Sequence, residues 1–183
     1  SGAFDHYAAG LQADIGKNAF EALRILSDGL LSHPANRLRR DLSTLEKIRP
    51  EVFILLYRFL FVLFAEDREI FPVEHPTYRD RYSLRWWRTH VTLPFERESS
   101  QALSDFGGKK DTRIWKRCQD LFHLIMTGSE LQGHRASEFS FRSYYGTIFD
   151  PELHPDLENW EISNEFMAEA IAGEAGIPMI RLD

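Results

Sequence analysis

Few side chains in this sequence could support catalysis. Its histidines are scattered along the chain: His6, His33, His75, His90, His123, His134 and His154. None pairs at the spacing of a helical zinc site, and the one cysteine, Cys118, lies on the apolar face of an expected helix, where a thiol is a poor nucleophile. A metal-dependent enzyme would need several carboxylates to meet His75 at one site. The candidates are Glu66, Asp67 and Glu69, which do not share one helix face, so we expect no catalytic residue and no metal ligand.

The motifs that bind nucleotides or cut DNA are also missing. The stretch from Gly107 to Lys110 has neither the earlier glycine nor the Ser or Thr after lysine that a phosphate loop needs. A common nuclease signature places an acidic residue two positions before a lysine. Those positions hold Ile15, Leu45, Gly107, Gly108 and Ile114. No Gly-x-Gly-x-x-Gly follows an expected strand, so we expect no cofactor site in this chain, including none for S-adenosylmethionine.

Three groups of basic residues remain as candidates for contact with a partner. They are Arg37, Arg39 and Arg40; then Arg79, Arg81, Arg85 and Arg88; and finally Arg113, Lys116 and Arg117. A functional interpretation is contact with DNA phosphates or with an acidic neighbouring domain. The simpler interpretation is ion pairing within an acidic chain, and we favour it for most of these residues.

Aromatic residues supply the candidate protein interface. Trp86 and Trp87 cannot both face the core of one helix, because neighbouring residues point about 100° apart. We expect one of them to meet another segment or a partner domain. Tyr144 and Tyr145 are interface candidates in a later, aromatic stretch.

Composition limits the class of protein. The chain has 183 residues, of which 43% are hydrophobic, and this is enough for one domain with a buried core. A formal charge of -6 argues against broad electrostatic DNA binding, so any contact with nucleic acid must be local. A single cysteine excludes an intramolecular disulfide framework and favours a reducing, cytoplasmic location.

We expect one helical module over residues 3–183, cut from a longer chain. Ser1-Gly2 is typical of the residues left by cleavage of an expression tag. No signal peptide is visible near the start. The longest apolar stretch, 52–65, is too short to cross a bilayer and contains Arg58, so we expect no membrane contact.

The elements that would position these residues are helices. Apolar residues recur at three- and four-residue spacing over 19–31, and the proline after His33 ends that pattern. A short amphipathic piece over 42–48 runs up to Pro50. We predict Pro50 as the first-turn residue of a long helix through Ala65 towards residue 70. Two further prolines, at 72 and 76, then break the chain.

The second half follows the same pattern. Ser83 is expected to cap a short helix over 84–90, and residues 105–110 form a polar loop. A helix with one apolar stripe follows over 113–127 and ends at Gly128, and a last helix covers 164–174. We therefore predict an all-α fold: an irregular multi-helix bundle with long loops. There is room for one short β-hairpin near 139–149.

Three segments resemble, in order and spacing, a known group of enzymes. The first is Leu-Tyr-Arg-Phe-Leu-Phe-Val-Leu-Phe-Ala-Glu-Asp-Arg at 56–68, and the second is Tyr-Tyr-Gly-Thr-Ile-Phe-Asp-Pro-Glu-Leu-His-Pro at 144–155. The third is Ile-Ser-Asn-Glu with the helix after it, at 162–171. They are similar to the helical region before the methyltransferase domain of type IIG restriction-modification enzymes and of BREX-type phage-defence adenine methyltransferases. Tyr145 stands where the family has Asn, and Thr147 where it has Gly.

The resemblance implies a role as a non-catalytic connector. Such enzymes carry an N-terminal nuclease or other region, a helical connector, an S-adenosylmethionine-dependent adenine-N6 DNA methyltransferase and a target-recognition domain. The Asn-Pro-Pro-Tyr-type catalytic motif and the cofactor motif are absent here, so no catalytic or cofactor residue is carried over. The expected partners are the adjacent domains of the same chain, with DNA as a further candidate. A stand-alone helical adaptor for protein interaction is the alternative.

Overall fold

The computed structural model describes residues 19–97, 100–128, 143 and 146–172. Residues 19–32 are helical. The elements that follow are η1 (Pro34–Asn36), α2 (Leu42–Asp67), α3 (Pro76–Arg81), α4 (Leu84–Trp87), the π-helical turn η2 (Arg88–Thr92), α5 (Leu93–Glu96), α6 (Ser100–Phe106), α7 (Arg113–Thr127), η4 (Thr147–Phe149), α8 (Pro155–Asn159) and α9 (Asn164–Ala172). The described residues contain helices and no strand, which confirms the all-α prediction.

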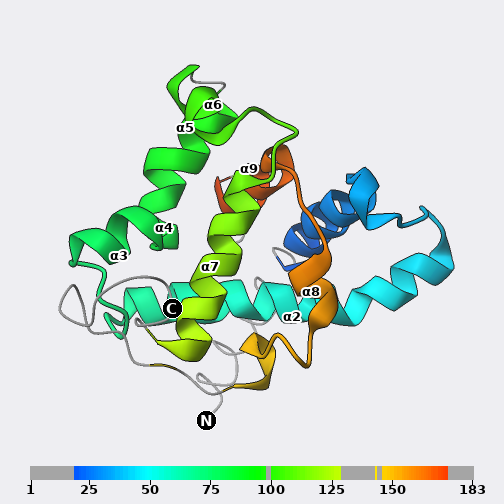
Figure 1. The fold of residues 1–183 in the computed structure, drawn as a ribbon, viewed down its shortest axis with the longest axis horizontal. Coiled ribbons are helices and arrows are strands. Elements are labelled where there is room, and N and C mark those ends of the chain that lie inside the picture. Colours follow the sequence, from blue (N-terminus) through cyan, green and yellow to red (C-terminus); the bar gives the residue numbers. More distant parts are fainter. Residues whose placement is uncertain (1–18, 98–99, 129–142, 144–145, 173–183) are drawn as a thin grey trace, which may run out of the picture.

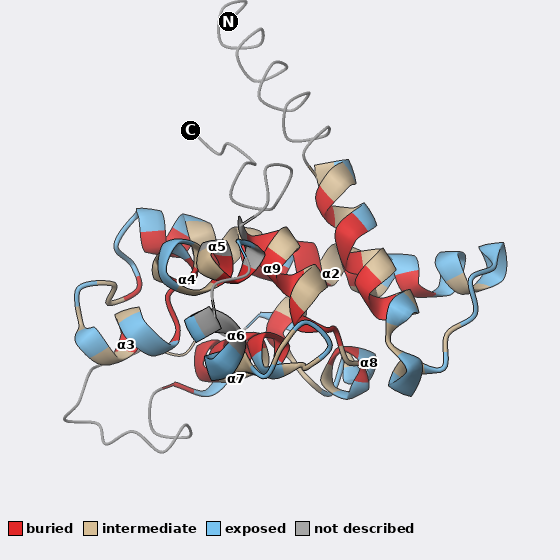
Figure 2. Ribbon diagram, turned by 90° about the horizontal axis from the view of Figure 1, so that it is seen from above, coloured by how far each residue is buried: buried red, intermediate tan, exposed pale blue. Residues whose placement is uncertain are grey.

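The long helix α2 forms the base of the molecule and α7 crosses it (Figure 1). Helices α3 to α6 lie on one side of α7, and the helix of residues 19–32 lies on the other. Helix α9 packs against η2, α5 and α7, while η4 packs between α2 and α7. Buried residues concentrate where α2, α7 and α9 meet (Figure 2). No helix in the described ranges is long and apolar enough to span a bilayer.

Helix α2 begins earlier than predicted. It starts at Leu42, where the Asp41 carboxylate accepts a hydrogen bond from the Thr44 N–H at 2.8 Å. Pro50 therefore lies inside the helix, and the prediction that it opens the first turn is wrong. Proline lacks an N–H, so it leaves the Glu46 carbonyl without its intrahelical partner, and the first turns of α2 are inclined to the rest (Figure 1). Ile48 on one side of the proline is buried in the common core, which holds the two parts as one helix.

Two residues at helix starts act as their types suggest. The Ser83 hydroxyl accepts a hydrogen bond from the Trp86 N–H at 3.3 Å, which confirms it as the cap of α4. His75 caps α3 through Nδ1, which accepts from the Thr77 N–H at 3.2 Å. The predicted helix over 84–90 is too short, because the chain stays helical through η2 and α5 to Glu96.

Helix α7 follows its predicted pattern closely. Its apolar stripe is buried: Ile114, Trp115, Cys118, Leu121, Phe122 and Ile125. The helix ends at Gly128, whose φ of 84° is a conformation that glycine adopts at little cost. The polar loop before it is shorter than predicted, because residues 105 and 106 belong to α6.

The predicted hairpin near 139–149 is only partly covered by the structure. Residues 139–142, 144 and 145 lie outside the described residues. Residues 147–149 form the 3₁₀ turn η4, so a strand in this part is excluded. Phe149 is buried here, with its ring 5.3 Å from that of Phe61 and 5.9 Å from that of Phe122. These contacts with α2 and α7 stabilise the tight turn, and a β-hairpin would not bring Phe149 to the same place.

We expect Gly29→Ala to destabilise the fold, although alanine is the better helix former. A Cβ at Gly29 would lie 2.9 Å from the Ile162 Cγ2 atom and 3.0 Å from the Phe166 Cβ atom. Relieving that overlap separates residues 19–32 from α9, which should lower the free energy of unfolding by about 1 to 2 kcal/mol. Urea unfolding measures the difference. Gly146→Ala is the control, since a Cβ there meets nothing within 4 Å, and an unchanged Gly29→Ala midpoint would contradict the close packing.

Candidate nucleic-acid and domain interface

The first arginine cluster lies between η1 and α2. Arg37, Arg39 and Arg40 are exposed, and Arg37 ends η1 with a φ of 53°. Arg40 is engaged within the chain: its Nη2 donates to the Ser32 hydroxyl at 2.7 Å, and its Nη1 lies 3.6 Å from the Asp28 carboxylate. This cluster and the α3–α4 region lie at opposite ends of the molecule (Figures 1 and 2). The structure therefore does not bring the first two clusters together.

The second cluster surrounds Trp86. Arg79 pairs with Asp80 at 2.8 Å, and its guanidinium carbon lies 4.7 Å from the centre of the Trp86 ring. The His90 ring stacks on the same indole at 3.5 Å, nearly parallel to it. Arg85 is exposed. Trp86 is therefore a half-buried aromatic surface that is already packed by cationic and imidazole side chains.

Trp87 takes the opposite role to its neighbour. It is buried, its Nε1 donates to the Asp80 carbonyl at 3.2 Å, and its ring lies edge-on to Phe106 at 5.9 Å. Trp86 is thus the less buried tryptophan of the pair. Tyr144 and Tyr145, the other interface candidates, lie outside the described residues.

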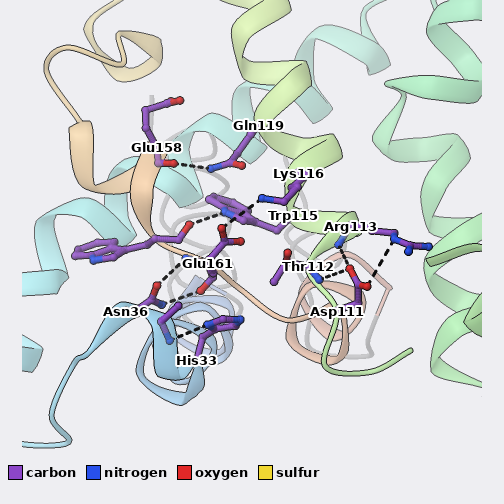
Figure 3. Close-up of polar contacts among 12 residues, drawn as sticks. His33, Asn36, Asp111, Thr112, Arg113, Trp115, Lys116, Gln119, Glu158 and Glu161 are labelled. Carbon is purple, nitrogen blue, oxygen red and sulfur yellow. Dashed lines mark hydrogen bonds and ion pairs between the residues drawn. The ribbon is translucent and has the colours of Figure 1, made fainter. Parts of the chain in front are cut away.

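The third basic group lies on α7, and two of its three side chains form ion pairs within the chain. Lys116 reaches the Glu161 carboxylate at 3.3 Å, and Arg113 lies 3.6 Å from the Asp111 carboxylate (Figure 3). Arg117 differs from both, because it is half-buried and its guanidinium carbon lies 5.8 Å from the centre of the Trp87 ring.

Two asparagines tie distant segments together, and sequence reasoning missed both. The Asn36 side chain accepts from the Glu161 N–H at 2.7 Å and donates to the Glu161 and Leu30 carbonyls at 2.8 Å each (Figure 3). The Asn164 Oδ1 atom accepts from the Ile114 N–H at 3.0 Å, next to the Arg113 N–H, which the Asp111 carboxylate accepts at 3.1 Å, so a distant and a local side chain together cap α7. Their structural roles were missed because the Ile114 partner of Asn164 and the Glu161 partner of Asn36 are 50 and 125 positions away along the chain.

The Asn164 amide nitrogen explains the loop that resembled a phosphate-binding motif. It donates to the Phe106 carbonyl at 2.7 Å and to the Gly108 carbonyl at 2.8 Å. Lys110 pairs with Glu165 at 2.7 Å. The glycines and this lysine therefore serve to dock α9 against the start of α7.

Glu66 is a fully buried carboxylate with a structural role. It accepts hydrogen bonds from the Ser83 hydroxyl and, at 3.0 Å, from the Leu84 N–H, so it joins α2 to the start of α4. Burial raises its pKa to about 7, although these hydrogen bonds lower it. Asp67 and Glu69 point to solvent, and no three His, Cys, Asp or Glu side chains within the described ranges converge as metal ligands.

Arg58 is the other buried charge. Its Nε donates to the Ile148 carbonyl, and its guanidinium carbon lies 5.1 Å from the centre of the Phe122 ring and 5.8 Å from that of Phe149. Burial lowers its pKa to about 10, against the attraction of two nearby glutamates. It stays charged at neutral pH and holds η4 on α2 and α7 by cation–π contact.

Cys118 lies on the apolar face of α7, as predicted. It is buried there, and burial raises its pKa, which leaves the thiol unreactive.

The chain was also compared with protein families, with curated proteins and with solved structures, and none of them matches it.

Proposed function

We propose that this chain is the non-catalytic helical connector of a restriction-modification or phage-defence DNA methyltransferase. It would hold neighbouring nuclease, methyltransferase or recognition domains at fixed positions and touch the DNA backbone. The observation that carries this proposal is the set of hydrogen bonds made by residues 161–164 to Asn36 and to the start of α7. These ties join the first described helix, α7 and α9 into one block, as a spacer between domains requires.

The proposal assigns the chemistry to the neighbouring domain. S-adenosylmethionine would be bound there, and methyl transfer to adenine N6 would occur there. In this chain two candidate acid–base groups have structural roles: Glu66 joins two helices, and His75 caps one. The exposed residues Arg37, Arg39 and Arg85 are available to acidic neighbours. A cytoplasmic location belongs to the same proposal.

Sequencing the genomic DNA beyond the codon for Asp183 tests this role. We expect the reading frame to continue into a cofactor-binding glycine motif and then an Asn-Pro-Pro-Tyr-like tetrad. A stop codon directly after Asp183 would overturn the connector and favour a stand-alone protein. Because the test depends on the gene alone, it is independent of any binding assay on the protein.

One observation favours the alternative, a helical adaptor. Helix α2 carries a row of exposed or half-buried aromatic residues, Phe53, Tyr57 and Phe64, spaced one turn and then two turns apart. Arg49 lies 5.7 Å from the Phe53 ring centre, and Arg68 lies 4.8 Å from that of Phe64, so the row has an arginine at each end. Aromatic and arginine side chains are enriched in protein interfaces. A connector could use the same row for its adjacent domain.

A further inference from the structure

Two arginines from different helices lie near one carboxylate, Asp120, beside a cavity. Arg81, at the end of α3, has its Nη2 4.0 Å from the Asp120 carboxylate of α7, which is the outer limit of an ion pair. Arg117, one turn before Asp120, makes no hydrogen bond or ion pair in the part of the chain that the structure describes. With Asp105, which lines the same cavity, the two arginines and two aspartates balance in charge, and Arg117 is the arginine of this group without a direct partner among the described residues.

The surroundings limit how Arg117 can respond. Its guanidinium lies over the Trp87 ring, and burial, followed by repulsion from Arg81, lowers the pKa of Arg117. Arg117 nevertheless remains charged at neutral pH, since guanidinium pKa values lie far above it. Asp120 offsets part of this repulsion, and Arg117 keeps donors that can bind an anion.

The cavity gives an anion access. It has a volume of about 470 Å³ and is lined by Val91, Asp105, Phe106, Arg113, Lys116, Arg117 and Asp120. Arg113 and Lys116 are occupied by Asp111 and Glu161 and point towards them (Figure 3). The Asp105 carboxylate accepts from the Gln101 amide at 2.8 Å. The free guanidinium donors in the lining are therefore those of Arg117, while Arg81, beside the cavity, is shared between Asp120 and the Tyr82 hydroxyl.

We infer that Arg81 and Arg117 form a phosphate-binding site, which a DNA backbone phosphate occupies by displacing Asp120. Planar guanidinium groups match phosphate geometry with two parallel hydrogen bonds, and a pair of them from two helices can hold one phosphate. A phosphate contact positions DNA without reading its sequence, in keeping with a connector. The identity of the polymer rests on the proposed function, whereas the phosphate chemistry rests on the geometry alone.

The test is fluorescence anisotropy of a labelled DNA duplex with the intact chain at 50 and 200 mM salt. We expect Arg117→Gln to weaken binding about tenfold and to reduce the salt slope by about one. Asp120→Asn removes the competing carboxylate, so we expect it to tighten binding about threefold. Arg24→Gln, on an exposed and ion-paired arginine, and Glu152→Gln, on an exposed glutamate, match these two charge changes and should behave like the wild type.

A second arm uses inorganic phosphate and follows the arginine Nε–H signals by NMR. Saturable shifts at Arg81 and Arg117, together with the two opposite effects on DNA, support the site with DNA as its ligand. Phosphate-induced NMR shifts in a protein that does not bind DNA would support the phosphate site but overturn DNA as its ligand, and would favour a free phosphate ester. Equal binding by wild type and Arg117→Gln, or no phosphate shift, overturns the site itself. None of these results alters the outcome of reading the gene beyond Asp183.

Discussion

Replacing Asn164 by alanine is expected to lower the free energy of unfolding by about 4 kcal/mol, a large fraction of the stability of a domain of this size. The Asn164 side chain is fully buried, and its amide satisfies three backbone groups. Alanine leaves the Ile114 N–H and two loop carbonyls without partners, and each such buried group is destabilising by about 1 to 3 kcal/mol. The separate contributions do not add fully, because the three groups share one site.

Urea unfolding followed by far-UV circular dichroism measures this loss. Asn159→Ala is the matched control, because Asn159 is exposed and ends the neighbouring helix α8. We expect the control to differ from the wild type by less than about 0.5 kcal/mol. Equal stability of the two alanine variants would contradict the role of Asn164 as the cap of α7.

The stability of the protein is expected to fall as the pH rises from about 4.5 to about 7, because of Glu66. Burial raises the pKa of Glu66 from 4.5 to about 7 in the folded chain. The folded state therefore holds this proton more tightly than the unfolded state does. The resulting stabilisation is fully present below pH 4.5 and is lost as the pH rises through 7, an effect of about 3 kcal/mol from this group.

The variant Glu66→Gln isolates this effect. Glutamine mimics the protonated acid: its amide oxygen can accept from the Leu84 N–H, and its NH₂ group can donate to the Ser83 hydroxyl. We expect the variant to match the wild type at pH 4.5 and to exceed it by about 3 kcal/mol at pH 8. Glu46→Gln, on an exposed residue of the same helix, should leave the pH profile of urea unfolding unchanged. A Glu66→Gln profile as steep as that of the wild type would show that another group causes the pH dependence.

Local signals in the sequence were sufficient for much of the fold. The stripe of α7 was predicted because its apolar spacing matches the helix period, and the Ser83 cap because a hydroxyl precedes the helix it serves. Pro50 misled the prediction because first-turn geometry is only a preference. The packed residues on both sides of it keep one continuous helix.

The candidate site was predictable as a set of residues but not as an arrangement. Spacing identified all three basic groups, yet it could not tell that Lys116 would meet Glu161 or that Arg81 would meet Asp120. Each of these pairs joins residues 39 or more positions apart, and such contacts depend on the tertiary fold. Asn36 and Asn164 were missed for the same reason.

The placement of residues 161–164 also sets the order in which the chain can fold during synthesis. The Asn36 side chain is made early, but its partner at Glu161 is 125 residues further along the chain. Helix α7 likewise waits for Asn164 to complete its first turn. Contacts of such long range form slowly, so the part of α2 that packs on η4 and α8 is covered only after residues 147–159 have been made. The core of the described residues is therefore completed only after α9 has been synthesised.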